Sequence, residues 1–430
     1  MITIVQLLLF IIITALSVRY IFTPVTLIPH PFVEKAKFQA TGTQCFLLFL
    51  LASSILSLGN FMAMRLFVSI LLVLIAIFYD KNRPAFSITT LTYALFLLWL
   101  LCAIYYSPVR EYGFRVFLKY SYPFLLLILA AKLSSNPVYA HKALKVIFMV
   151  GVVGALYLFV VLRIPLLSRL LSPYMWWFPA ILDFMGVPLA ISLAYYTMLK
   201  KKKYLWSCLL FVLPCLVNVN RTGLLVVSIS IAIFALIRYN LRSIPYLLLA
   251  GGILIGSILY IPSIREKMFV KEYSAEYIIE NRDILTAEDI NSSGRFAMWE
   301  WSLKNYYEGN ELFGSGLGVL QERFYSLDHP FGELQVVHND YVQLLCDTGL
   351  VGLILYVSIF VFMIVHSISI FYSKNNQPVV KLLAIISATS IAGMTAALYT
   401  DNAVNYSLMT LGYPFAIYGM MVGLRKTGGT

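Results

Sequence analysis

The segment around which the chain is organised runs from Phe313 to Leu353 and reads FGSGLGVLQERFYSLDHPFGELQVVHNDYVQLLCDTGLVGL. It begins as a glycine-rich polar stretch and ends as an apolar run with helical spacing. His338, Asn339 and Asp340 lie where the two parts meet. The segment therefore predicts an imidazole ring at the point where a long loop enters an apolar helix.

The composition on either side of this segment is typical of a membrane protein. Of the 430 residues, 60% are hydrophobic and only 12% are charged, and the mean hydropathy is +0.83. A soluble chain of this size cannot bury that much apolar surface. The apolar runs are long and do not alternate with polar residues, which favours helices over a barrel. We therefore predict an all-α polytopic membrane protein.

The apolar runs predict 12–13 transmembrane helices, each about as long as a bilayer requires. They lie near residues 2–22, 44–59, 61–79, 86–106, 117–133, 143–163, 179–199, 204–220, 222–239, 245–262, 339–367, 380–400 and 404–424. Residues 1–262 then hold the first ten spans, and residues 263–338 form one large periplasmic loop with short surface helices. Residues 339–430 hold the last three spans and a short cytoplasmic tail.

The distribution of charge predicts the orientation of these spans. The positive-inside rule puts the basic run 200–203 in the cytoplasm, and counting spans puts Arg238 and Arg242 on the same side. The loop from Ile264 to Val337 carries seven Lys/Arg and thirteen Asp/Glu, a net charge of −6, so the rest of the chain carries +18. The overall charge of +12 thus reflects topology and does not indicate nucleic-acid binding.

The middle of the loop has an amphipathic helical pattern that begins at Arg295. Ser292 and Ser293 precede it as a helix-start signal. The pattern predicts one apolar face, made of Phe296, Trp299, Leu303 and Tyr306. Trp and Tyr favour the headgroup region, so we expect this helix at the membrane surface.

Two arginines on the exterior side have both structural and functional interpretations. Arg221 lies between apolar runs, beside Asn218 and Asn220, and it either holds an anion or caps a turn and snorkels to the headgroups. Arg295 either holds the same anion or is a solvated or phospholipid-bound cation. Guanidinium groups match phosphate oxygens in a bidentate manner, so two of them suit a pyrophosphate.

His338 opens the span that follows the loop. It either helps to start the helix or acts as a general base, since imidazole titrates near neutral pH. Asn339 and Asp340 either cap the helix or orient the ring. The glycine-rich stretch 314–318 lacks the Lys-Ser/Thr of a P-loop and predicts a tight turn. Metal-ligand patterns are missing from the exterior segments, so we expect neither a metal nor a cofactor.

Four motifs together resemble the bacterial O-antigen polymerase and O-antigen ligase superfamily of membrane-embedded C-type glycosyltransferases. They are Asn-Arg-Thr-Gly at 220–223, Ser-Gly-Arg at 293–295, Phe-Gly-Ser-Gly-Leu-Gly at 313–318 and His-Asn-Asp-Tyr-Val-Gln-Leu-Leu-Cys-Asp-Thr-Gly-Leu-Val-Gly at 338–352. The last is the most specific. The resemblance covers roughly residues 204–368, and the first half of the chain contributes hydropathy only.

The resemblance implies a metal-independent, inverting glycosyltransferase in the bacterial inner membrane, with its active site facing the periplasm. Its donor would be a glycan on undecaprenyl pyrophosphate, held by Arg221 and Arg295, and His338 would act on the acceptor hydroxyl. Membrane lipids and a chain-length regulator are further expected partners. The secondary candidates, to which no chemistry is assigned, are Asn339, Tyr341, Arg265, Arg282 and Arg323.

Three functions remain open at this point. A polymerase would join lipid-linked repeat units, and a ligase would transfer the glycan to lipid A-core. We favour the polymerase, because the exterior loop has few surplus cations to face a phosphorylated core. A polytopic transporter of lipids or sugars is the third function. It would require polar groups at the bilayer midplane, for which Asp183 is the main candidate.

Overall fold

The computed structural model describes residues 40–57, 65–74, 87–134, 136–175, 178–218, 220–269, 274–280, 294–332 and 334–427. Across these ranges the chain folds into α-helices with short 3₁₀ and π segments and no strand. The α-helices are α2 (Gly42–Ser53), α4 (Ile88–Tyr106), α5 (Arg110–Leu133), α6 (Pro137–Phe159), α7 (Pro165–Leu171), α8 (Phe178–Phe184), α9 (Gly186–Leu199), α10 (Lys202–Val217), α11 (Arg221–Tyr239), α12 (Ile244–Tyr260), α13 (Pro262–Met268), α14 (Ala275–Glu280), α15 (Arg295–Ser302), α16 (Val319–Tyr325), α17 (Asp340–Tyr372), α18 (Pro378–Thr400) and α19 (Gly412–Thr427).

The predicted fold class, an all-α polytopic membrane protein, is confirmed. Within the described ranges, seven helical stretches are long and apolar enough to cross a bilayer. One of them, Arg221–Ser257, contains both α11 and α12, because only the short 3₁₀ turn η3 (Asn240–Ser243) separates these helices. The predicted span 2–22 lies outside the described residues, so the total of twelve or thirteen spans stays a prediction.

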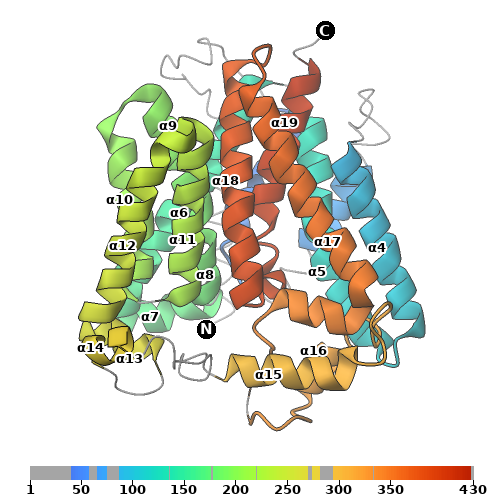
Figure 1. Ribbon diagram of the computed structural model, residues 1–430. Helices are drawn as coiled ribbons and strands as arrows, with labels where there is room; N and C mark the ends of the chain where they lie inside the picture. Colours follow the sequence, from blue (N-terminus) through green and yellow to red (C-terminus); the bar gives the residue numbers. More distant parts are fainter. Residues whose placement is uncertain are drawn as a thin grey trace.

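Helix α18 lies at the centre of the bundle, and α4 and α12 lie at its edge (Figure 1). In the apolar window of Pro378–Thr400, 89% of the residues are buried, against 28% in that of Arg221–Ser257. Large apolar side chains on the outer helices are exposed, for example Leu98 of α4 and Leu248 of α12. In a bilayer these surfaces face acyl chains, so their exposure costs nothing.

The predicted span 404–424 is interrupted. Residues Ala403–Tyr406 form a 3₁₀ turn, η6, and α19 begins only at Gly412. The polar groups in this stretch explain the irregular backbone: the Thr410 hydroxyl donates to the Ala403 carbonyl at 2.7 Å, and the Val404 N–H donates to Asp340 Oδ2 at 3.0 Å. These contacts replace the hydrogen bonds that a continuous helix would make.

Helix α17, predicted as one uninterrupted span, is kinked at Gly349. This residue has φ +66° and ψ −170°, a combination close to the region that only glycine adopts readily. The loop backbone lies against the kink, since the Leu350 N–H donates to the Glu311 carbonyl at 2.8 Å and the Ser315 N–H donates to the Cys346 carbonyl at 2.8 Å. A Cβ at Gly349 would lie 2.2 Å from the Leu312 carbonyl oxygen.

The glycine-rich stretch 314–318 is the tight turn that was predicted. Gly314, Gly316 and Gly318 all have positive φ. The turn leads into α16, whose first backbone N–H groups are satisfied by a buried carboxylate on α17: Gly318 N and Leu320 N donate to the two oxygens of Asp347 at 2.9 and 3.0 Å. The start of α16 is thereby fixed to α17.

Helices α15 and α16 lie together at one end of α17 (Figure 1). They enclose a small apolar core of their own, formed by Met298, Leu320, Phe324, Val337 and Cys346. The predicted apolar face of the 295–306 helix is therefore wrong in part. Met298 is fully buried, whereas Phe296 is exposed, because Met298 packs into the core that the helix shares with α16 and α17. The predicted start signal at Ser292 and Ser293 lies outside the described residues.

Candidate functional site

The junction at His338 begins with a sharp backbone turn. His338 has φ +54°, in the left-handed region, and its backbone N–H donates to Asn402 Oδ1. Asn339 is the N-cap of α17, and its Oδ1 accepts from the N–H groups of Tyr341 and Val342, both at 3.0 Å. Of the two roles considered for Asn339, helix capping is the one observed.

The ring of His338 is held by a carboxylate that follows α18. His338 Nδ1 lies 2.9 Å from Asp401 Oδ1. The His338 side chain is 27% exposed and that of Asp401 only 8%, so the carboxylate is buried behind a ring that solvent can reach. A carboxylate accepts and does not donate, so Nδ1 carries the proton and Nε2 is the nitrogen that can accept one.

A polar cluster fastens the first turn of α17 to the end of α18. The Asn402 side-chain amide donates to Gln343 Oε1 at 3.0 Å and to Asp340 Oδ1 at 3.4 Å. Asp340 also accepts from the Val404 N–H. All three side chains are buried. Asp340 therefore does not bond to the ring, as one of its predicted roles required; it fixes the segment that carries Asp401.

Arg295, at the start of α15 in the loop, contacts the same end of α18. Its Nη1 donates to the carbonyl of Thr400, the residue before Asp401. One turn further along α15, Trp299 Nε1 donates to the Val337 carbonyl at 2.9 Å, and the Trp299 ring lies 5.5 Å from the Tyr399 ring. Helix α15 is thus fixed both to the residue before His338 and to the end of α18, which brings Arg295 and His338 together.

Arg221 is the first residue of α11, a helix that packs against α18, α9 and α8. Its neighbour Asn220 caps that helix, accepting from the Gly223 N–H at 2.6 Å. Arg221 is half-buried and lies near enough to Arg295 for the two positive charges to repel each other. Two cations held at close quarters favour an anion between them.

Asp183, considered at first as a midplane group of a transporter, lies beside this cluster. It is fully buried, and neither of its oxygens has a hydrogen-bond partner within the described ranges. Its carboxyl lies within electrostatic range of Asp401, Asp340 and Arg295. A buried carboxyl without partners is costly, and its proximity to Arg295 links α8 to the site.

The secondary candidates fall into two groups. Tyr341 belongs to the junction, and its hydroxyl donates to the Thr395 carbonyl of α18 at 3.1 Å. Two arginines do not join the site: Arg265 donates to the Leu259 carbonyl at 2.8 Å, and Arg323 pairs with Asp328 at the surface of the loop. Arg282 lies outside the described residues.

Sequence reasoning assigned no function to Asp401 or Asn402. The two lie between the predicted spans 380–400 and 404–424. A polar pair directly after a long apolar helix was a usable signal, because such a pair needs partners at membrane depth.

The described residues thus define a polytopic all-α membrane protein in which two arginines and a carboxylate-bound histidine gather at one end of the bundle. Residues 206–357 match the family model described as O-antigen ligase. The match covers about a third of the chain and supports a relationship to the O-antigen ligase and polymerase superfamily. The matched segment includes Arg221, Arg295 and His338 and ends before Asp401. No curated protein matches the chain.

Proposed function

We propose that this chain is a glycosyltransferase of the bacterial inner membrane that transfers a glycan from undecaprenyl pyrophosphate to a sugar hydroxyl at the periplasmic face. His338 is the base, and Arg221 and Arg295 hold the pyrophosphate. The observation that carries the proposal is the hydrogen bond of His338 Nδ1 to the buried Asp401, next to the Arg295 guanidinium.

In this reaction the acceptor oxygen attacks the anomeric carbon of the donor sugar. The bond from that carbon to the pyrophosphate oxygen breaks as the new glycosidic bond forms, which inverts the configuration. The acceptor proton passes to His338 Nε2, and Asp401 stabilises the resulting imidazolium. Because Asp401 fixes the tautomer, Nε2 is ready to accept the proton without rearrangement.

The leaving pyrophosphate gains negative charge as the bond breaks. Two fixed guanidinium groups stabilise that charge with little reorganisation, since they are already held near each other in a partly dry site. Their mutual repulsion in the absence of an anion favours binding of the donor. A metal ion is not needed for this task, so we expect activity to survive a chelator such as EDTA.

We favour a lipid-linked repeat unit as acceptor, which makes the enzyme a polymerase, because the acidic loop does not suit a phosphorylated core. A ligase is the second candidate, because the family model that residues 206–357 match is described as O-antigen ligase. A transporter is disfavoured, because Asp183, its expected midplane group, lies near the same cluster as Arg295.

Deleting the gene in its host separates the two enzymes. Surface polysaccharide reduced to a single repeat unit on lipid A-core supports the polymerase. Lipid-linked polymer together with bare core supports the ligase. Unchanged surface polysaccharide would contradict both.

The base is tested by His338→Gln, with His329→Gln as the matched control. Both are loop-side histidines, but His329 stacks on Phe324 away from the cluster. We expect His338→Gln to lower transfer about 100-fold or more, since general-base catalysis contributes about 10²–10⁴, and His329→Gln to retain it. Equal activity of both variants at matched membrane levels would exclude His338 as the base.

A further inference from the structure

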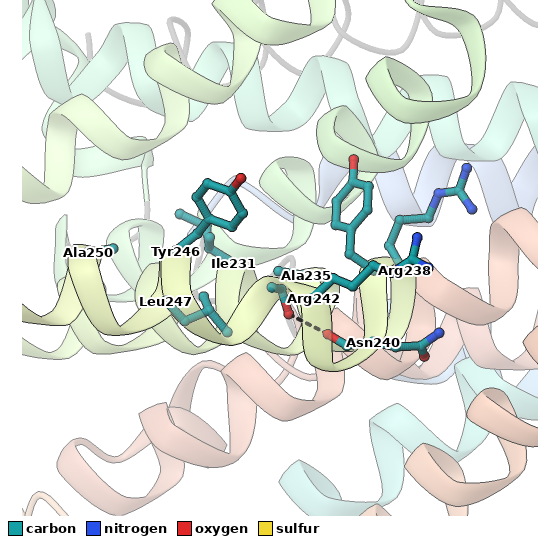
Figure 2. Close-up of a pocket in the computed structure, with 10 residues that line it drawn as sticks. Ile231, Ala235, Arg238, Asn240, Arg242, Tyr246, Leu247 and Ala250 are labelled. Carbon is teal, nitrogen blue, oxygen red and sulfur yellow. Dashed lines mark hydrogen bonds between the residues drawn. The ribbon is translucent and has the colours of Figure 1, made fainter.

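A cavity of about 720 Å³ lies between α11 and α12, next to the turn η3 that joins them (Figure 2). It is at the far end of α11 from Arg221. A helix of 19 residues is about 28 Å long, so the cavity is on the opposite side of the bundle from the candidate catalytic residues. By the positive-inside rule this is the cytoplasmic side.

The mouth of the cavity is cationic. Arg238, at the end of α11, and Arg242, in η3, both line it, and they extend in the same direction in Figure 2. Both are exposed, and neither makes an ion pair within the described ranges. The cavity lining contains no acidic residue, so two positive charges are free to meet an anion.

The cavity becomes apolar along the two helices. Ile231 and Ala235 of α11 face Leu247 and Ala250 of α12 across it. The next residue of α12, Gly251, has open space beside it, and the outward side chains of this helix are exposed. A cationic mouth at the bilayer surface therefore continues into an apolar crevice at acyl-chain depth.

The wall of the cavity is held in place by hydrogen bonds. The Tyr372 hydroxyl at the end of α17 lies 2.7 Å from the Ile237 carbonyl and 2.6 Å from Asn240 Oδ1. Ser243 donates to the Asn240 carbonyl at 2.8 Å, the dashed line in Figure 2. These bonds fix η3, and with it the spacing of Arg238 and Arg242, so the cavity is preformed.

We propose that this cavity binds an anionic diacyl phospholipid of the cytoplasmic leaflet, with the phosphate between Arg238 and Arg242 and an acyl chain between α11 and α12. A free phosphate would leave the apolar part unfilled, and an apolar helix would leave both arginines unpaired. A glycan would leave the apolar part between α11 and α12 without a matching group. The inference does not depend on the proposed function, because it concerns the other end of the molecule.

The test is native mass spectrometry of the full chain taken from nanodiscs that contain equal amounts of phosphatidylglycerol and phosphatidylcholine. We expect wild type to retain phosphatidylglycerol in preference. A juxtamembrane arginine contributes about 1 kcal/mol to the binding of anionic lipid, or about fivefold. Arg238→Ala should therefore lower the ratio of retained phosphatidylglycerol to retained phosphatidylcholine about fivefold. The double variant Arg238→Ala/Arg242→Ala should lower this ratio further. Ala235→Phe, which narrows the apolar part of the cavity and keeps its charge, should also lower the preference.

The matched control is the double variant Lys201→Ala/Lys202→Ala, which removes two exposed cations elsewhere on the same side. It should lower the ratio less than the double arginine variant does, because these lysines do not line the cavity. All variants should keep the wild-type melting midpoint in phosphatidylcholine alone. Unchanged retention in the double arginine variant would overturn the proposal, as would an equal loss in the lysine control. Displacement of phosphatidylglycerol by inorganic phosphate, or preferential retention of undecaprenyl phosphate, would equally overturn it.

Discussion

At the scale of single residues, the site depends on a contact between positions 63 residues apart. Asp401 accepts from His338 Nδ1 at 2.9 Å, and it is itself buried. A histidine beside a buried carboxylate has one tautomer and one orientation, and this is the arrangement that a base on Nε2 requires. We therefore regard Asp401 as a positioning residue, which acts through His338.

Replacing Asp401 by Asn keeps the size of the side chain and removes its charge. We expect Asp401→Asn to lower transfer about 100-fold or more, because the amide can stabilise the wrong tautomer; the same change in the Ser-His-Asp triad costs about 10⁴. The measurement is chain length and rate in membranes with equal amounts of protein. Asp328→Asn, at an exposed carboxylate of the 263–338 loop, is the control, and a loss in both variants would contradict a specific role for Asp401.

The guanidinium of Arg295 has a geometric role that an ammonium cannot fill. It donates to the Thr400 carbonyl and leaves other N–H groups for a phosphate oxygen, so Arg295→Lys should lose about tenfold or more in transfer although the charge is kept. Arg323→Lys is the matched control, because Arg323 pairs with Asp328 at the surface of the loop. Full activity of Arg295→Lys would contradict bidentate binding of the pyrophosphate by the Arg295 guanidinium.

The sequence could indicate Arg221, Arg295 and His338 as candidates but not their hydrogen-bond partners. The arginines stand out as charged groups on the side that normally lacks cations, and all three residues lie in recognisable motifs. Asp401 and Asp183 lie at the edge of or within apolar runs, and hydropathy does not reveal which helix ends meet. That information comes from packing between α18, α17 and α8.

At the scale of elements, the kink of α17 decides where the loop docks. Trp99 of α4 donates to the Thr348 carbonyl at 3.1 Å, which the kink leaves available to a side chain. On the other side of the kink the loop backbone pairs with residues 346–350. The kink therefore connects the loop that carries Arg295 to the helix that begins beside His338.

Gly349→Ala should destabilise the protein by about 1–3 kcal/mol or more, because alanine resists the backbone conformation at this kink and its Cβ would meet the Leu312 carbonyl oxygen at 2.2 Å. The matched control is Gly252→Ala, in the middle of α12 with nothing within 4 Å of the added atom, which should be neutral or stabilising by up to about 1 kcal/mol. Thermal unfolding in detergent measures both. Equal midpoints for the two variants would contradict the kink's role.

The existence of the membrane-spanning helices could be predicted from composition. The positions at which those helices break could not. The predicted spans 86–106 and 222–239 match α4 and α11 closely, because long apolar runs have no alternative to a helix in lipid. The kink at Gly349 and the irregular segment after Asn402 were missed. Both are set by polar contacts with distant segments, Glu311 in one case and Asp340 in the other.

At the scale of the whole molecule, the two ends of the bundle differ in the functional groups that they carry. One end carries the folded loop, the carboxylate-bound His338 and the two clustered arginines. The other carries the basic run 200–203 and the cavity at Arg238 and Arg242. The positive-inside rule assigns the second end to the cytoplasm, and the proposed reaction needs the first end outside, where the lipid-linked donor is presented.

This orientation can be measured with a membrane-impermeant maleimide on intact cells, in a Cys102→Ser background that removes the exposed native thiol. Ser326→Cys, on the exposed surface of the loop, should be labelled without lysis, and Lys201→Cys only after lysis. Both positions are exposed, so a difference in labelling reports the side of the membrane and not burial. The reverse pattern would put the candidate site in the cytoplasm, and periplasmic glycan transfer at His338 would then be impossible. Labelling of both on intact cells would show that the preparation leaks and would require repeating it with a cytoplasmic control protein.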